Sequence, residues 1–171
     1  MIVQTDPVEI ERKFLVNGQA WREGATGEPI SQGYLPTADK CSVRIRIVGA
    51  RAFLTVKGPP VEGARAEFEY PVPVDHAASM LRQFCQGRMI AKRRYSLRHG
   101  GRIWTVDAFE GPLAGLLLAE VELDHVGQAV DLPPWLGREV TDDPRYLNSA
   151  LAAAPAPPDD ACDADRSGQP V

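Results

Sequence analysis

The stretch Glu9-Ile10-Glu11-Arg12-Lys13-Phe14 decides how the rest of the chain is interpreted. As a β-strand it places Glu9, Glu11 and Lys13 on one face, because side chains along a strand alternate with a period of two. Ile10 and Phe14 fall on the opposite, apolar face. Later stretches repeat this division, with charges whose sign changes from one stretch to the next. The sequence therefore predicts a set of strands that share one charged interior.

Seven further stretches have the pattern of short strands with turn residues between them. They are residues 30–35, 42–48, 51–57, 64–72, 90–97, 102–109 and 116–124. Between Pro73 and Gln86, apolar residues recur at three- and four-residue steps, which indicates an amphipathic helix with Asp75 at its N-cap. Residues 133–151 are expected to form one or two short helical pieces. Since eight short strands are enough to close a barrel, we predict an α+β, mainly β fold: a closed eight-stranded antiparallel β-barrel with a charged lumen and a few helices packed outside.

Length and charge limit the possible functions. A chain of 171 residues suits a single domain, which we place at residues 1–151, followed by an Ala/Pro/Asp-rich tail at 152–171 that we expect to be disordered. The tail contributes −3 of the net charge of −4, through Asp159, Asp160, Asp163 and Asp165 against Arg166. Because the body is then nearly neutral, we expect no binding to nucleic acid or to an anionic membrane.

The cysteines and the hydropathy pattern bear on location. Cys41, Cys85 and Cys162 are odd in number and have no metal-type spacing, which favours a reducing compartment. The sequence has no signal-peptide pattern and no apolar run long enough to span a bilayer. We therefore predict a cytoplasmic protein, and a homodimer is compatible with the sequence.

The charged strand faces form two sets. The basic set is Lys13, Arg44, Arg46, Lys57, Lys92 and Arg94, and the acidic set is Glu9, Glu11, Glu67, Glu69, Asp107, Glu120 and Glu122. For any one strand, a solvent-exposed face of an antiparallel sheet is the simplest interpretation. For the whole set, the doubling of one sign on each strand and the number of strands favour a closed lumen instead.

Such a lumen has a definite chemistry. Unpaired buried charges are costly, so it must interleave acids with bases or hold a charged ligand. Arginine and lysine can grip several phosphates. Carboxylates supply the hard oxygen ligands that Mg²⁺ or Mn²⁺ prefers. Together the two sets predict a site for a metal–polyphosphate complex.

These residues carry a resemblance to a known family. The chain resembles the CYTH superfamily, the triphosphate tunnel metalloenzymes, whose mark is an N-terminal Glu-x-Glu-x-Lys, here Glu9, Glu11 and Lys13. The resemblance continues through Arg44-x-Arg46, the Thr-Val-Lys-Gly run holding Lys57, Glu67-x-Glu69, Lys92-x-Arg94, Asp107, Glu120-x-Glu122 and the stretch 139–148. It covers roughly residues 8–151, and the motifs occur in order.

The resemblance implies an eight-stranded tunnel that hydrolyses or cyclises a triphosphate with a divalent metal. It implies that the six basic residues hold the phosphates. It also implies that Glu9, Glu11, Glu120 and Glu122 bind the metal, with Glu67, Glu69 and Asp107 as helpers. Short members of this type resemble inorganic triphosphatases, which cleave tripolyphosphate to pyrophosphate and phosphate. In these a Lys–Tyr pair, matched here by Lys13 and Tyr34, is implicated in catalysis, and Lys57 could protonate or neutralise the leaving phosphate.

Other functions stay open at this point. From the residues alone, a core tyrosine is a better interpretation of Tyr34 than a hydroxyl presented to a site. A class IV adenylate cyclase or a thiamine triphosphatase would share the site and differ in substrate. A non-catalytic module could bind polyphosphate or a nucleotide without turnover, and a structural barrel would have only paired charges. The six glutamates favour catalysis over simple anion binding, because a pure anion binder gains nothing from them.

Overall fold

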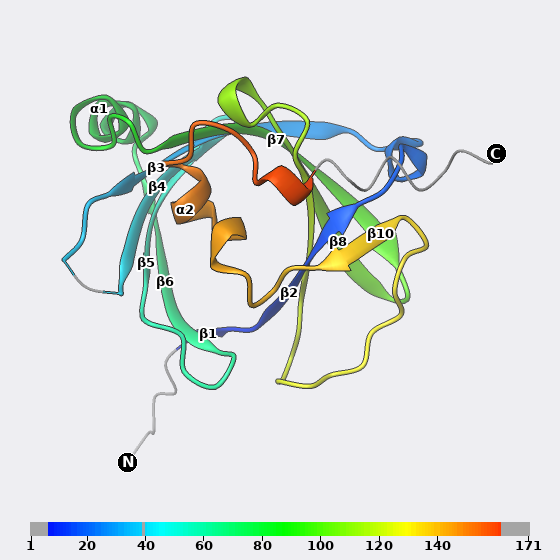
Figure 1. Ribbon diagram of the computed structural model, residues 1–171. Coiled ribbons are helices and arrows are strands. Elements are labelled where there is room, and N and C mark those ends of the chain that lie inside the picture. Colours follow the sequence, from blue (N-terminus) through cyan, green and yellow to red (C-terminus); the bar gives the residue numbers. More distant parts are fainter. Residues whose placement is uncertain (1–6, 39, 162–171) are drawn as a thin grey trace, which may run out of the picture.

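The computed structural model describes residues 7–38 and 40–161 (Figure 1). Cys162 and the last part of the expected tail, residues 162–171, lie outside the described residues. Within the described part, no helix is long and apolar enough to cross a membrane.

The described residues form one large sheet with short helices. The strands are β1 (Val8–Glu9), β2 (Glu11–Val16), β3 (Gly27–Leu35), β4 (Ser42–Val48), β5 (Arg51–Lys57), β6 (Arg65–Val72), β7 (Met89–His99), β8 (Arg102–Phe109), β9 (Leu117–Glu122) and β10 (Leu136–Glu139). The helices are α1 (Val74–Phe84) and α2 (Asn148–Leu151), and the 3₁₀ turns are η1 (Ala20–Arg22), η2 (Gly111–Leu113), η3 (Pro144–Tyr146) and η4 (Asp159–Ala161).

The prediction of a mainly β fold with an antiparallel sheet is confirmed, but the prediction of a closed eight-stranded barrel is wrong. The described sheet has ten strands in the order β1-β6-β5-β4-β3-β7-β8-β9-β2-β10, with β1 and β10 at its two ends. Every neighbouring pair is antiparallel. Among the described residues no ladder joins the two ends, although the strands curl around a common interior in Figure 1.

The sheet has two strands more than predicted, and each arises for a different reason. The predicted first strand divides at Ile10, because its N-terminal part pairs with β6 and its C-terminal part pairs with β9. Ile10 still accepts a backbone hydrogen bond, from Leu123 at 2.8 Å. The other addition is β10, which pairs with β2 where the sequence predicts helical pieces. Its ladder is irregular between Leu136 and Glu139, so it gives little period-two signal.

Side-chain alternation separates an outer from an inner face. On the outer face, α1 packs with Ala77, Leu81 and Cys85 against Ile45 and Ala52. This confirms that a helix covers the outside of the sheet. Asp75 lies in the first turn of α1, but its predicted N-cap role is wrong, since the helix is preceded by Pro73 without a side-chain cap.

A second outer cluster lies on the other side of the sheet. Phe14 and Trp104 pack there at 5.8 Å between ring centroids, together with Trp21. These apolar contacts fix the register of β2, β8 and β9. Because side chains alternate, they turn Lys13, Thr105 and Glu120 inward.

The C-terminal segment does not follow the expected boundary at residue 151. Leu151 and Ala152 are buried with Tyr146 in an inner cluster, and Ala154 and Ala161 pack against it. The Tyr146 hydroxyl donates to Asp160 Oδ1 at 2.6 Å. Residues 152–161 are thus part of the packed body, contrary to the predicted disorder, because small alanine side chains and one aspartate dock there.

Candidate active site

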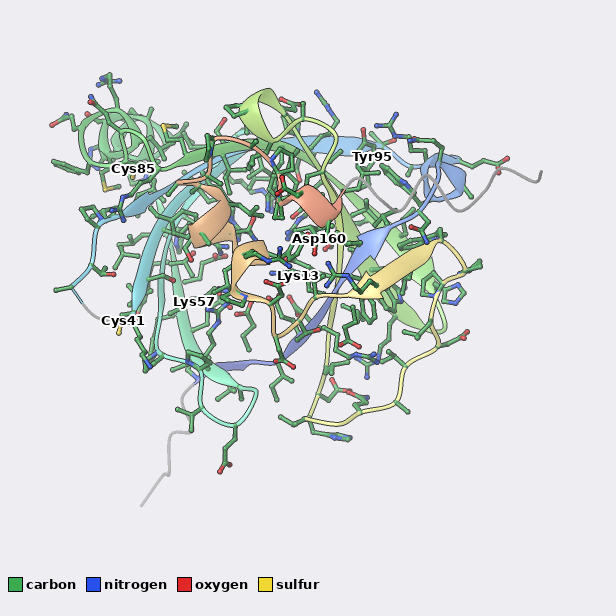
Figure 2. The ribbon with its side chains drawn as sticks, in the orientation of Figure 1. Lys13, Cys41, Lys57, Cys85, Tyr95 and Asp160 are labelled. Carbon is green, nitrogen blue, oxygen red and sulfur yellow. The ribbon has the colours of Figure 1, made fainter. Side chains whose placement is uncertain are left out.

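The inner face of the sheet encloses a cavity of about 980 Å³. Seven basic and seven acidic side chains are among its described lining residues: Lys13, Arg44, Arg46, Lys57, Arg65, Arg94 and Arg102, with Glu9, Glu11, Glu67, Glu69, Glu120, Glu122 and Asp124. Figure 2 shows Lys13 and Lys57 inside the ring of strands, whereas Cys85 lies beside α1. The cavity is therefore strongly charged and nearly balanced in sign.

At one side of the cavity, Glu9 is held by two cations. Lys57 Nζ donates to Glu9 Oε1 at 2.5 Å, and Arg65 Nε donates to Glu9 Oε2 at 3.2 Å. Burial alone would raise the pKa of Glu9, but the charges of Lys57 and Arg65 outweigh it and lower the pKa. Glu9 is thus an ionised carboxylate in this arrangement. Glu67 lies 3.3 Å from Lys57 and completes this group.

A second group surrounds Lys13. Its ammonium lies 3.1 Å from Glu120 Oε1 and 3.4 Å from Glu11 Oε1, and Arg94 Nη2 donates to Glu120 Oε2 at 2.9 Å. Burial opposes charge on Lys13, but Glu120 and Glu11 outweigh it and raise its pKa. Burial likewise acts against the Glu120 carboxylate, yet Lys13 and Arg94 hold the pKa of Glu120 well below its usual range. Lys13 therefore keeps its proton at neutral pH.

Glu11 differs from its neighbours. Burial raises the pKa of Glu11, and the nearby charges of Glu120 and Glu9 raise it further. In the ladder its Cα partner is Glu122, which is exposed. Glu11 thus sits among carboxylates with too little positive charge nearby.

The β4 arginines are only partly satisfied. Arg46 Nη2 donates to Glu69 Oε2 at 2.8 Å, and Arg44 Nη2 donates to the Thr55 hydroxyl at 3.2 Å. The Nε atoms of Arg44 and Arg46 are buried and have no hydrogen-bond partner among the described residues. Two guanidinium N–H groups are therefore buried in the cavity wall without a partner among the described residues.

Lys92 and Asp107 lie behind the cavity rather than in its wall. Neither is among its described lining residues, and they are 2% and 1% exposed. Lys92 Nζ donates to Asp107 Oδ2 at 2.6 Å and to Asn148 Oδ1 at 3.0 Å. Burial lowers the pKa of Lys92 to about 8 despite Asp107. The predicted contacts of this pair with phosphate and metal thus have no counterpart in the described geometry.

The remaining predicted residues do come together. Tyr34 lines the cavity with Lys13. Burial raises the pKa of Tyr34, against the opposing charges of Arg44 and Lys13, so the phenol is protonated at neutral pH. Of the thirteen charged residues predicted for the site, eleven line the cavity, and Lys92 and Asp107 do not.

Sequence reasoning missed several lining residues. Arg65 shares a strand face with Glu67 and Glu69, so its position could have been inferred from period two. Arg102 and Asp124, which pair at 2.6 Å, stand at strand ends and give no such signal. Leu147, Asn148 and Ser149 line the cavity from the C-terminal segment, so this segment does not pack outside the sheet as expected for the helices.

A metal would require some rearrangement of the acidic residues. Among residues 7–38 and 40–161, no three histidine, cysteine or acidic side chains gather in a ready metal-binding group. The donor chemistry nevertheless fits a hard divalent cation at Glu11, because it is buried beside Glu9 and Glu120 and the nearby charges of Lys13 and Lys57 do not offset the rise in its pKa. Asp107 fits poorly, because Lys92 and Arg94 already saturate it.

Fold and cavity define a protein whose curled antiparallel sheet presents a mixed-charge interior, and comparison with known proteins gives its family. The CYTH domain model matches residues 7–150. The chain belongs to the CYTH domain family, which confirms the predicted resemblance.

Two relatives are similar over most of their length. An inorganic triphosphatase of Acetivibrio thermocellus is 43% identical over 86% of this chain and 94% of its own. An inorganic triphosphatase of Nitrosomonas europaea is 41% identical over 84% of this chain and 96% of its own. Among solved structures, that of the inorganic triphosphatase NE1496 is similar with a TM-score of 0.60 and 38% identity, covering 85% of this chain and 95% of its own.

Proposed function

We propose that this protein is a divalent-metal-dependent triphosphatase that hydrolyses inorganic tripolyphosphate to pyrophosphate and phosphate. The observation that carries the proposal is the balanced cavity, with seven cationic and seven acidic side chains around one space. A cavity with only cations would suit a free polyanion. A balanced one suits a polyanion that brings its own divalent cations. The names of the two relatives support the same activity.

The phosphates would be bound by the cations of the cavity wall. Arg44 and Arg46 line the cavity, and their buried Nε atoms have no partner among the described residues, so a shift of either side chain toward a phosphate would gain a hydrogen bond there without breaking one at Nε. Lys13, Lys57 and Arg94 would exchange part of their carboxylate contacts for phosphate. Lys92 would act indirectly, by holding Asp107 and Asn148 in place.

The metal would be held by Glu9, Glu11, Glu120 and Glu122, with Glu67 and Glu69 nearby. When bound, Mg²⁺ or Mn²⁺ supplies charge neutralisation of the phosphate oxygens and activation of the attacking water. A cation near Glu11 would also relieve the repulsion that raises its pKa.

The protonation states assign roles to the Lys–Tyr pair. Lys13 and Tyr34 both keep their protons at neutral pH, so they serve as donors rather than as bases. Phosphoryl transfer depends chiefly on positioning and on stabilising charge, which suits two fixed donors at the phosphate oxygens. Lys57, which contacts Glu9 at the cavity wall, would neutralise the pyrophosphate leaving group.

The test is phosphate release from tripolyphosphate, ATP and thiamine triphosphate, each with Mg²⁺, with Mn²⁺ and with EDTA. Fast, metal-dependent release from tripolyphosphate is expected, with slower release from the organic triphosphates. Preference for ATP or thiamine triphosphate would replace the inorganic substrate. No turnover, together with a rise in melting temperature on adding metal and triphosphate, would indicate a binding module.

The predictions on location, oligomeric state, partners and domain bounds remain to be tested by experiment. A cytoplasmic location, a homodimer and the absence of nucleic-acid and membrane partners are tested by fractionation, by sedimentation and by binding assays. The single domain at residues 1–151 likewise stays a prediction, with its boundary moved by the packing of residues 152–161.

A further inference from the structure

Gln32 is a buried side chain directly behind Tyr34. Residues two apart on β3 share a face, so both side chains point inward. In the ladder Gln32 lies opposite Arg46, and Tyr34 lies opposite Arg44. Tyr34 is among the described residues that line the cavity, whereas Gln32 is not, and Gln32 is 0% exposed. Gln32 therefore reaches the cavity only through its neighbours.

The amide of Gln32 is unevenly satisfied. Its Nε2 donates to the Tyr34 hydroxyl at 3.1 Å. Its Oε1 is buried and has no hydrogen-bond partner in the described part of the chain. An apolar side chain of the same size would avoid the penalty of that orphan acceptor. Packing alone thus gives no reason for a glutamine here, and the bond to Tyr34 does.

That bond restricts what the phenol can do. A tyrosine hydroxyl both donates and accepts, and the amide of Gln32 occupies an accepting position. Lys13 and Arg44, whose charges act on Tyr34, have donors only. Glu120 also acts on Tyr34, but its carboxylate already binds Lys13 and Arg94. The phenol hydrogen is therefore left to be donated toward the cavity.

We propose that Gln32 is a positioning residue for Tyr34, holding the phenol so that its O–H donates to a phosphate oxygen of a triphosphate in the cavity. The inference rests on the proposed function and specifies how its site is kept in order. Gln32 itself contacts no substrate. It acts by fixing the ring and by occupying the other side of the phenol oxygen.

The kinetic test uses Gln32→Met, which keeps the length of the side chain and removes the amide. We expect kcat for tripolyphosphate to fall about tenfold, as for the loss of one well-placed hydrogen bond, with KM changed less than about twofold. Gln86→Met makes the same chemical change on an exposed side chain beyond α1 and should change neither constant. In a Tyr34→Phe background, Gln32→Met should cause no further loss, because the group it positions is gone.

The spectroscopic test does not depend on turnover. The chain has four tyrosines, so a protein labelled with ¹³C at tyrosine Cζ gives four signals, and Tyr34→Phe identifies that of Tyr34. Gln32→Met should shift this signal, and Gln86→Met should leave it in place. Gln32→Leu provides a second apolar variant if Gln32→Met does not fold.

Three results would overturn the proposal. These are an equal loss of kcat in the wild-type and Tyr34→Phe backgrounds, an unmoved Tyr34 signal, and an unchanged or higher kcat in Gln32→Met. The last is the result expected if Oε1 rather than Nε2 faced the phenol and accepted a hydrogen bond from it. A wild-type protein without triphosphatase activity would overturn the proposed function, and the Tyr34 signal would still decide whether Gln32 holds Tyr34.

Discussion

The pair Lys92–Asp107 and the pair Arg44–Arg46 both lie on inward faces of strands, but they differ in burial and in how completely they are hydrogen-bonded. Lys92 and Asp107 are almost fully buried, and Asp107 accepts hydrogen bonds from Lys92 and twice from Arg94, at 2.6 and 2.7 Å. Arg44 and Arg46 have side chains 12% and 16% exposed, and each keeps a buried Nε without a partner among the described residues.

The difference separates structural charge from functional charge. A buried charge whose partners are complete stabilises one arrangement and has nothing left for a ligand. A charge beside a cavity with an unmatched donor can gain a hydrogen bond when an anion arrives. Completeness of pairing therefore distinguishes the two better than charge or strand position does.

The largest effect is expected at Asp107. Asp107→Asn keeps the shape but leaves Lys92 buried without its carboxylate and takes one of two carboxylate partners from Arg94, which still contacts Glu120. We expect the free energy of unfolding to fall by about 3–5 kcal/mol, measured by urea denaturation. Asp124→Asn removes an exposed carboxylate from Arg102 and should change stability little. Wild-type stability in Asp107→Asn would break the comparison.

Arg46→Gln should differ from Asp107→Asn: we expect a large loss of activity and a small loss of stability. Removing a charged contact to substrate should lower kcat/KM for tripolyphosphate about 100-fold. Arg46→Lys, which keeps the charge and loses the forked donor, should fall in between. The matched control is Arg51→Gln, whose side chain is 66% exposed in a 3.5 Å pair with Glu28 and should behave as wild type. Equal activity in Arg46→Gln and Arg51→Gln would contradict the role of the unmatched donor.

Asp160→Asn tests whether the C-terminal segment belongs to the structural part. Asp160 accepts from the Tyr146 hydroxyl, from Arg138 at 2.7 Å and from Arg145 at 2.8 Å. Because these groups are partly exposed, we expect a loss of about 1 kcal/mol in the free energy of unfolding. Asp159→Asn is the control. No difference between the two variants would show that the packing of residues 152–161 does not depend on this contact.

Glu11→Gln should have the smallest effect on the free energy of unfolding, and it should stabilise the protein rather than destabilise it. The pKa of Glu11 is raised in the fold, so its ionised form opposes folding at neutral pH. Without metal, Glu11→Gln should raise the free energy of unfolding by about 0.5–1 kcal/mol at pH 7. The gain should vanish below about pH 4.3, where glutamate is protonated in both states. Glu120 has a lowered pKa, so its stabilisation is present above that pH and is lost as pH falls. A lower melting temperature for metal-free Glu11→Gln would contradict this sign.

The sequence predicts the inward charges well, because period two is a property of each strand by itself. Glu9, Glu11 and Lys13 face the cavity as the opening stretch indicates, and so do Arg44 and Arg46. The sequence does not predict which inward side chains reach the cavity and which are buried behind its wall. Lys92 and Arg94 share one face of β7, yet only Arg94 reaches the cavity.

Long-range packing accounts for what the sequence does not reveal. β10 is short and irregular and is defined by its pairing with β2. The alanines of residues 152–161 have the composition of a disordered tail, but Ala152, Ala154 and Ala161 pack in the cluster of Tyr146, whose hydroxyl donates to Asp160. Gln32 has no motif, and only its burial and its bond to Tyr34 draw attention to it.

The most direct test of the account is phosphate release from tripolyphosphate by Glu11→Gln beside the wild type, with Mg²⁺ at pH 7. The wild type should be active and should lose its activity in EDTA. Glu11→Gln should be at least about 100-fold slower while melting no lower than the wild type in the absence of metal. This combination would show that the Glu11 carboxylate is needed for activity although its charge lowers the stability of the metal-free fold. Wild-type activity in Glu11→Gln would contradict the assignment of the cavity as a metal-dependent triphosphate site.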